Sequence, residues 1–135
     1  MKESNTADSI QTHLYRLIIP EDILSNFEIE SVIENQEELL IVLVEKEILV
    51  PLALKGKEAC LDGYLNAVTL QHFSVIGKKC YLQLKRRGWK EKGQKEGKSV
   101  HNEYQFTASG TMATQAFGAF LKRNSLIATP STLAM

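Results

Sequence analysis

The chain has 135 residues, with sixteen basic and sixteen acidic side chains, so its formal net charge is zero. This length suits one domain with a real core, and a composition of 44% hydrophobic and 24% charged residues is ordinary for a soluble globular protein. No apolar run approaches the roughly 18 residues of a membrane span, and the polar N-terminus holds no signal-peptide core. Cys60 and Cys80 follow no metal or disulfide spacing, so we expect a cytoplasmic protein with reduced thiols, a disulfide between them being the alternative.

The first third of the chain predicts a flexible segment, a short helix and a hairpin. Residues 1–13 are expected to be flexible. Pro20 and the two acids that follow it suit the first turn of a helix over residues 20–26. Residues 27–34 alternate as a half-buried strand, with Phe27, Ile29 and Ile33 inward, and residues 39–44 form a continuous apolar strand. The polar residues between them predict a turn.

The middle of the chain contains the strongest strand pattern. Residues 45–62 are expected to form a long connection, with a short helix near residues 57–61 and a strand over 67–73. Residues 79–90 then alternate as a strand. One predicted face of this strand carries Cys80, Leu82 and Leu84, and the other carries Lys79, Tyr81, Gln83, Lys85, Arg87 and Trp89.

The last third predicts a hairpin loop over residues 91–97, a return strand over 99–108 and a helix over 111–123. Thr111 is the expected N-cap of this helix. Residues 125–135 are expected to be a disordered tail. The apolar stripe of the helix consists of Ala113, Ala116, Phe117, Phe120 and Leu121.

Together these elements predict an α+β fold for a single domain over residues 14–124. We expect an antiparallel sheet of four or five strands, with one main C-terminal helix packed on a face and a short N-terminal helix at an edge. The pattern does not determine the strand order.

The basic residues are concentrated between Lys78 and Lys98. This stretch holds nine of the sixteen basic residues and only two acids, Glu91 and Glu96, so its net charge is +7. Cations of this kind bind phosphates through counterion release, aromatic rings stack on bases, and a two-stranded ribbon fits a major groove. The predicted DNA contacts are Lys79, Tyr81, Lys85, Arg86, Arg87, Trp89, Lys90, Lys92, Lys95 and Lys98.

Two other interpretations of the same stretch stay open. Lysines on a hairpin are often simply solvated, and they discourage aggregation at a sheet edge. Arg86 or Arg87 can instead pair with the acidic surface over residues 28–38, and Trp89 can cap the core. Charge pattern alone does not separate these interpretations from DNA binding.

No catalytic or metal-binding pattern is visible in the sequence. His13, His72 and His101 are scattered, with none at ligand spacing from a cysteine. Ser109 lacks the preceding glycine of a nucleophile elbow. We therefore expect a protein that is not an enzyme and that needs no cofactor or metal.

An ordered set of short motifs resembles a known family. These motifs are Ile19-Pro20-Glu21, Phe27-Glu28-Ile29, Gly63-Tyr64, Val68-Thr69, Gly77 to Leu82, Lys85 to Trp89, Asn102 to Phe106, Gly110-Thr111-Met112 and Ala119-Phe120-Leu121. Over about residues 17–124 the chain is similar to the N-terminal region of bacterial insertion-sequence transposases of the Aon type, in the ISL3-like group. In that family the basic run before the tryptophan is uninterrupted, whereas Gly88 interrupts it here.

The resemblance implies a non-catalytic accessory domain that holds the DNA ends of the element. The family's catalytic domain, an RNase-H-like fold with acidic metal ligands, lies downstream, so a catalytic transposase subunit is an implied partner. The alternative is a protein-interaction or oligomerisation module. In that case the apolar strand over residues 39–44 and the helix over 117–121 would form a homodimer face.

Overall fold

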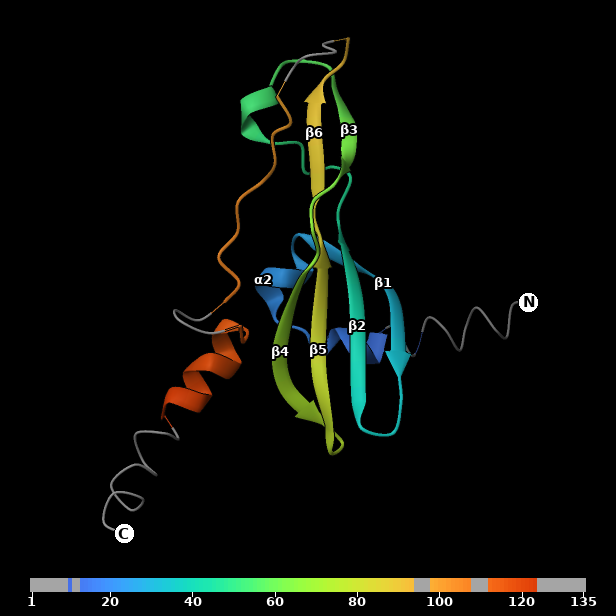
Figure 1. Ribbon diagram of the computed structural model, residues 1–135, viewed down its shortest axis with the longest axis vertical. Helices are drawn as coiled ribbons and strands as arrows, with labels where there is room; N and C mark the ends of the chain where they lie inside the picture. The colour runs from blue at the N-terminus through green and yellow to red at the C-terminus, as the bar shows by residue number, and fades with distance from the viewer. Residues whose placement is uncertain (1–9, 11–12, 94–97, 108–111, 124–135) are drawn as a thin grey trace, which may run out of the picture.

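The computed structural model describes residues 10, 13–93, 98–107 and 112–123, and its fold is α+β (Figure 1). Within these residues no helix is long and apolar enough to cross a membrane. The predicted tail lies outside the described residues, as does most of the predicted flexible N-terminus, although His13 already begins a helical turn over 13–16. The further elements are α2 (Glu21–Leu24), β1 (Phe27–Glu34), β2 (Glu38–Glu45), η1 (Leu52–Leu54), β3 (Ala59–Tyr64), β4 (Val68–Val75), β5 (Lys78–Lys85), β6 (Arg87–Glu91) and a C-terminal helix over 115–123.

The main sheet has four strands in the order β1-β2-β5-β4. The two outer pairs, β1–β2 and β4–β5, are antiparallel as expected. The prediction of a purely antiparallel sheet is wrong at the centre, where β2 and β5 pair in parallel. A parallel pair needs a crossover connection, and residues 46–77 supply it, with η1, β3 and β4 along the way. The apolar run of β2 suits this position because a central strand has neighbours on both sides.

The core lies on one face of this sheet. Cys80, Leu82 and Leu84 are fully buried, as predicted, and they are in register with Leu39, Ile41 and Leu43 of β2. This face is covered by Ile19 and Ile23 from the N-terminal segment and by an aromatic group of Phe27, Tyr104 and Phe106.

A bulge in β1 changes one predicted contact. The β1–β2 register shifts between Ile29 and Ser31, so Val32 turns toward the core and packs against it. Ile33, predicted to point inward, is 57% exposed. A bulge inserts one unpaired residue and exchanges the two faces of the strand beyond it, which a regular alternation over residues 27–34 cannot predict.

Beyond the main sheet, β5 continues into β6, which pairs with β3 in a second, two-stranded sheet (Figure 1). We call the described residues of 51–64 and 87–100 the arm, because they project from the main sheet. The predicted strand over 79–90 is therefore interrupted at Arg86, and the helix predicted near 57–61 is wrong because β3 begins there. The predicted return strand over 99–108 is reduced, in its described part, to two isolated bridges, at Val100 and Thr107.

The C-terminal helix begins later than predicted. Thr114 caps it, accepting the backbone N–H of Phe117 on its hydroxyl at 3.3 Å. The predicted cap, Thr111, lies outside the described residues. Phe117 and Phe120 contact the Phe73 ring with centroids 5.0 and 5.3 Å away, so the helix packs beside β4. Three members of the predicted stripe, Ala116, Phe120 and Leu121, are exposed.

His72 joins this helix to the N-terminal segment. The His72 side chain is buried, with its Nε2 2.8 Å from the carbonyl oxygen of Ile18 and its Nδ1 2.8 Å from the Thr114 hydroxyl. A carbonyl only accepts, so Nε2 carries the proton and Nδ1 accepts from Thr114. This is a neutral imidazole. Burial lowers the pKa of His72, and the bond to Ile18 opposes that shift only in part.

Because His72 is buried, we predict that the free energy of unfolding falls as the pH drops below ~6.5. The unfolded chain protonates this histidine near its ordinary pKa of 6.5, whereas the folded chain resists protonation to lower pH. Its contribution is therefore complete above pH ~6.5 and is lost as the pH falls toward the folded pKa. Urea unfolding at pH 7.5 and pH 5 measures this loss. His72→Gln should flatten the dependence and the exposed His101→Gln should not; an unchanged slope in His72→Gln would contradict the assignment.

Candidate nucleic-acid interface

The basic stretch is laid out along the length of the molecule and does not form one patch. Lys79 lies near the start of β5, and Lys92 lies just beyond the end of β6 (Figure 1). At about 3.3 Å per residue, thirteen residues of extended chain place these two backbones roughly 40 Å apart. The two ends of the predicted contact set therefore do not share one compact surface.

Three lysines of the stretch form ion pairs within the fold. Lys85 Nζ lies 2.7 Å from Glu30, and Lys78 binds Glu34 and the carbonyl oxygen of Asn35. Because β2 lies between β1 and β5, both pairs cross over β2. Lys90 Nζ lies 3.8 Å from Asp62 of β3. Acidic residues of β1 thus neutralise part of the basic stretch. The alternative interpretation of the sequence expected such pairs for the arginines, whereas the structure forms them with lysines.

Arg87, predicted to face outward, is buried and only 7% exposed. Its Nε donates to the backbone carbonyl oxygen of Glu45 at 2.7 Å, and its Nη1 lies 3.4 Å from the Tyr64 hydroxyl. Its Nη2 is 3.8 Å from Glu47. The prediction that Arg87 presents its charge at the surface is wrong, because the break at Arg86 turns it toward the junction of the two sheets.

Glu45 is the centre of this junction and is fully buried. Its carboxylate accepts the backbone N–H of Arg87 at 2.9 Å, the Asn102 amide at 3.0 Å and the Tyr104 hydroxyl. Burial, and then the neighbouring Glu45 carboxylate, raise the pKa of Tyr104, so its hydroxyl remains a donor. These bonds join β2, β6 and the described residues 98–107, which we call the return segment, and thereby fix the arm to the main sheet.

Trp89 is also buried, at 7% exposure, so the prediction that it faces outward is wrong. Its register partners are Leu61 on β3 and Val100 on the return segment. Pro51 and Leu54 of the arm are buried as well. Trp89 therefore belongs to the small core of the arm, the kind of role that the alternative interpretation gave it. Its indole N–H has no partner within the described part of the chain.

The glycine that interrupts the basic run has a structural reason. A Cβ at Gly88 would lie 2.9 Å from the carbonyl oxygen of Asp62 and 3.0 Å from the Ser99 hydroxyl. The two strands of the arm and the segment that carries Ser99 come this close only where no side chain intervenes. Arg86, two residues earlier, is half-buried; its Nη2 lies 3.4 Å from the Asn66 carbonyl oxygen and its Nε has no described partner.

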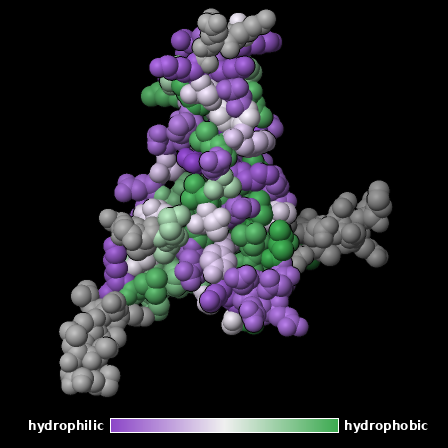
Figure 2. Space-filling view, in the orientation of Figure 1, coloured by the Kyte–Doolittle hydropathy of each residue, from purple (hydrophilic) through white to green (hydrophobic). Residues whose placement is uncertain are grey.

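The remaining predicted contacts that the structure describes are exposed or half-buried. Tyr81 is half-buried on the sheet face opposite the core, and Lys95 lies outside the described residues. Across residues 13–93, 98–107 and 112–123, no ion pair is recorded for four exposed lysines of this region: Lys55, Lys79, Lys92 and Lys98. Three of the four lie in the outer part of the arm, where hydrophilic side chains cover most of the face seen in Figure 2.

Tyr64 is a surface residue that the predicted contact set missed. It is 51% exposed at the inner end of β3. Lys85 Nζ and Arg87 Cζ lie 5.6 and 5.5 Å from its ring centroid, within cation–π range. The sequence signal was Gly63, because a glycine inside a strand often marks a bulge that redirects a side chain. The β3–β6 register shifts between Leu61 and Tyr64.

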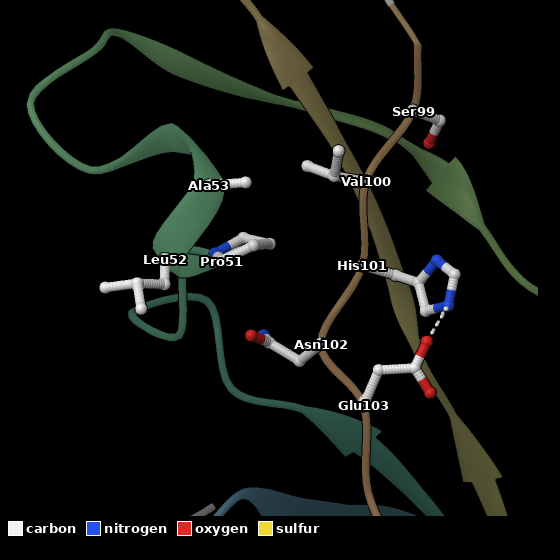
Figure 3. A pocket seen from close by; sticks show the side chains of 8 residues that line it. All are labelled: Pro51, Leu52, Ala53, Ser99, Val100, His101, Asn102 and Glu103. Atoms are coloured by element: carbon white, nitrogen blue, oxygen red, sulfur yellow. Dashed lines mark ion pairs between the residues drawn. The ribbon is translucent and has the colours of Figure 1, made fainter.

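A cavity of about 450 Å³ lies between η1 and the return segment (Figure 3). Val100 and Asn102 point toward Pro51 and Ala53, whereas His101 and Glu103 point to the other side of the segment. His101 Nε2 lies 3.1 Å from Glu103. The Asn102 amide already donates to Glu45 and to the Leu49 carbonyl oxygen. The polar group on this wall of the cavity therefore stabilises the fold.

The described residues contain no group of three histidines, cysteines or acids that could hold a metal ion. Both cysteines are free thiols. Burial raises the pKa of Cys80 to about 11, so its thiol is protonated and unreactive at neutral pH.

Comparison of the chain with protein-family models, curated proteins and solved structures finds no match.

Proposed function

We propose that the chain is a non-catalytic DNA-binding accessory domain of an insertion-sequence transposase, and that the arm is its contact surface. The observation that supports this most is the distribution of unpaired charge. Lys78 and Lys85 of the main sheet form internal ion pairs, although Lys79 does not, whereas Lys55, Lys92 and Lys98 are all exposed on the arm without ion pairs among the described residues. Unpaired cations on a narrow ribbon can neutralise phosphates and release counterions.

The transposase part of the proposal rests on the family resemblance. The catalytic domain of that family lies downstream of the region that this chain resembles, so the proposed protein partner is the catalytic subunit. DNA of the mobile element is the proposed ligand, which places the domain in the cytoplasm. Arg87 and Trp89 then support the arm, and Lys90, Lys92 and Lys98 approach the phosphates.

The salt dependence of DNA binding tests this assignment. In the Lys92→Ala/Lys98→Ala variant, the slope of log affinity against log salt for duplex DNA should decrease by about 1.8, because each lysine releases about 0.9 counterion. Fluorescence anisotropy with a labelled duplex at 50–200 mM salt, roughly the range over which the effect is large, gives the slope. A matched double variant off the arm, Lys79→Ala/Arg123→Ala, removes the same charge and should keep the wild-type slope. Equal slopes for the arm variant and the wild type would remove the arm from the interface.

One further observation favours a second candidate, a protein-interaction module. Met112, just before the C-terminal helix, and Phe120 and Leu121, within it, are 63%, 36% and 42% exposed. The strand over residues 39–44, predicted to share in a dimer face, is instead the interior strand β2. If the wild-type protein fails to bind duplex DNA even at low salt, this surface and the catalytic subunit as its partner become the leading assignment.

A further inference from the structure

We infer that Tyr64 is a stacking platform for an unpaired base, so that the arm prefers single-stranded or frayed DNA to an intact duplex. This inference rests on the proposed function and names the form of nucleic acid that the site takes. It follows from the exposure of the ring, from the groups that hold it and from the chemistry of base recognition.

The backbone directs the Tyr64 ring outward. Gly63 has a φ of +75°, a left-handed conformation that glycine adopts without strain, and the β3–β6 register shifts at this point. After the bulge Tyr64 pairs with Arg87, yet it remains 51% exposed, whereas Arg87 is buried. The bulge therefore leaves a large aromatic ring exposed to solvent. Packing alone would not require a strand residue to be placed in this way.

The ring is held in place before any ligand binds. Lys85 and Arg87 both approach it from the β5–β6 strand, at 5.6 and 5.5 Å from the centroid. Arg87 is itself fixed by its 2.7 Å bond to the Glu45 carbonyl oxygen. Because buried Arg87 holds one side of the ring, stacking loses little side-chain entropy.

The charges beside the ring suit a phosphate backbone. Lys85 Nζ lies 2.7 Å from Glu30, but both side chains are more than a third exposed, at 34% for Lys85 and 42% for Glu30. An exposed pair of this kind contributes little to stability, so a phosphate can replace the carboxylate. Half-buried Arg86 adds a third cation within two residues.

The other large rings of the described chain do not offer this combination. Trp89 is 7% exposed, so neither face of its indole is accessible. Phe120, an exposed phenylalanine of the C-terminal helix, contacts Phe73 and Phe117, and no cation–π contact is found for it among the described residues. Tyr64 combines a free surface with cations.

An unpaired base matches this surface better than a duplex. In a duplex each base is covered above and below by its neighbours, and a protein reaches only the base edges in the grooves. A ring can stack only on a base whose face is free, and such stacking is tolerant of sequence. Single strands and frayed ends supply such faces.

Binding of one oligonucleotide in single-stranded and in duplex form tests the inference. Tyr64→Ala should weaken single-strand binding by roughly 5- to 150-fold, the range for loss of one stacked base, and should leave duplex binding nearly unchanged. Tyr64→Phe keeps the ring and should bind as the wild type does. Leu61→Ala replaces a neighbouring β3 residue that is 43% exposed and serves as the matched control. A 2-aminopurine base in the single strand should be quenched by the wild type and by Tyr64→Phe, and not by Tyr64→Ala.

The outcomes separate the two proposals. If Tyr64→Ala binds both forms like the wild type, or weakens both forms equally, the stacking inference is wrong and DNA binding by the arm stands. If Tyr64→Phe loses as much as Tyr64→Ala, the hydroxyl and not the ring is responsible, and the inference is again wrong. If the wild type binds neither form at low salt, the proposed function itself is overturned.

Discussion

Glu45→Ala is expected to lower the free energy of unfolding by about 3–5 kcal/mol, because it leaves several buried donors without an acceptor. The Glu45 carboxylate is fully buried and accepts from the Arg87 backbone, the Asn102 amide and the Tyr104 hydroxyl. These donors come from β6 and the return segment, so their loss also releases the arm from the main sheet. A loss of this size is a large part of the total stability of a small domain.

Glu47→Ala is the matched control for this prediction. Glu47 lies two residues beyond Glu45, is 80% exposed on its side chain, and is 3.8 Å from Arg87. Removing an exposed partner at that distance should change stability by less than about 1 kcal/mol. Urea unfolding followed by circular dichroism measures both variants. Similar small losses in the two variants would show that the Glu45 network does not hold the junction. Glu45→Gln should lie between them, because an amide keeps one acceptor but directs a donor at other donors.

The parts of the fold that could be predicted from the sequence are those set by local pattern. The alternation of Cys80, Leu82 and Leu84 predicted the buried face of β5, and the first hairpin and the helix beginning at Pro20 were located to within a few residues. The pattern could not predict pairing between distant strands. A buried apolar strand such as β2 has the same composition beside a parallel or an antiparallel neighbour, so the parallel β2–β5 pair was not foreseen.

The candidate site was harder to predict than the fold. On an alternating strand, the residues that face inward and those that face outward exchange places after a break. A regular strand from residue 79 to residue 90 places Lys85, Arg87 and Trp89 on one outward face. The break at Arg86 places Arg87 and Trp89 inside, while Lys85 stays at the surface. The glycines were the local signal of irregularity, since Gly88 is crowded and Gly63 adopts a positive φ. A charge pattern reports which residues are basic, but not which acids fold against them.

Trp89→Ala is expected to lower the free energy of unfolding by about 3–5 kcal/mol, the usual loss for removing a large buried ring. Trp89 is 7% exposed within an arm whose other buried residues include Pro51 and Leu54, so the cavity left by alanine has few side chains to fill it. Trp89→Phe should lose less, about 1 kcal/mol, because it keeps most of the apolar volume and removes an indole N–H that has no described partner. Thermal unfolding measures both variants, and the exposed Tyr64→Ala should stay within about 1 kcal/mol of the wild type.

The fluorescence of Trp89 distinguishes a core residue from a DNA contact in the wild-type protein. As the only tryptophan of the chain, it reports on its own surroundings alone. A buried indole should emit at short wavelength and resist quenching by iodide, and adding oligonucleotide should change neither property. If Trp89→Ala keeps wild-type stability but loses DNA binding, and DNA quenches the wild-type emission, then Trp89 is a contact residue and the buried position is wrong. If stability falls and emission is shielded with or without DNA, the tryptophan of the basic stretch builds the arm, and the contact with nucleic acid belongs to the lysines and Tyr64 on its surface.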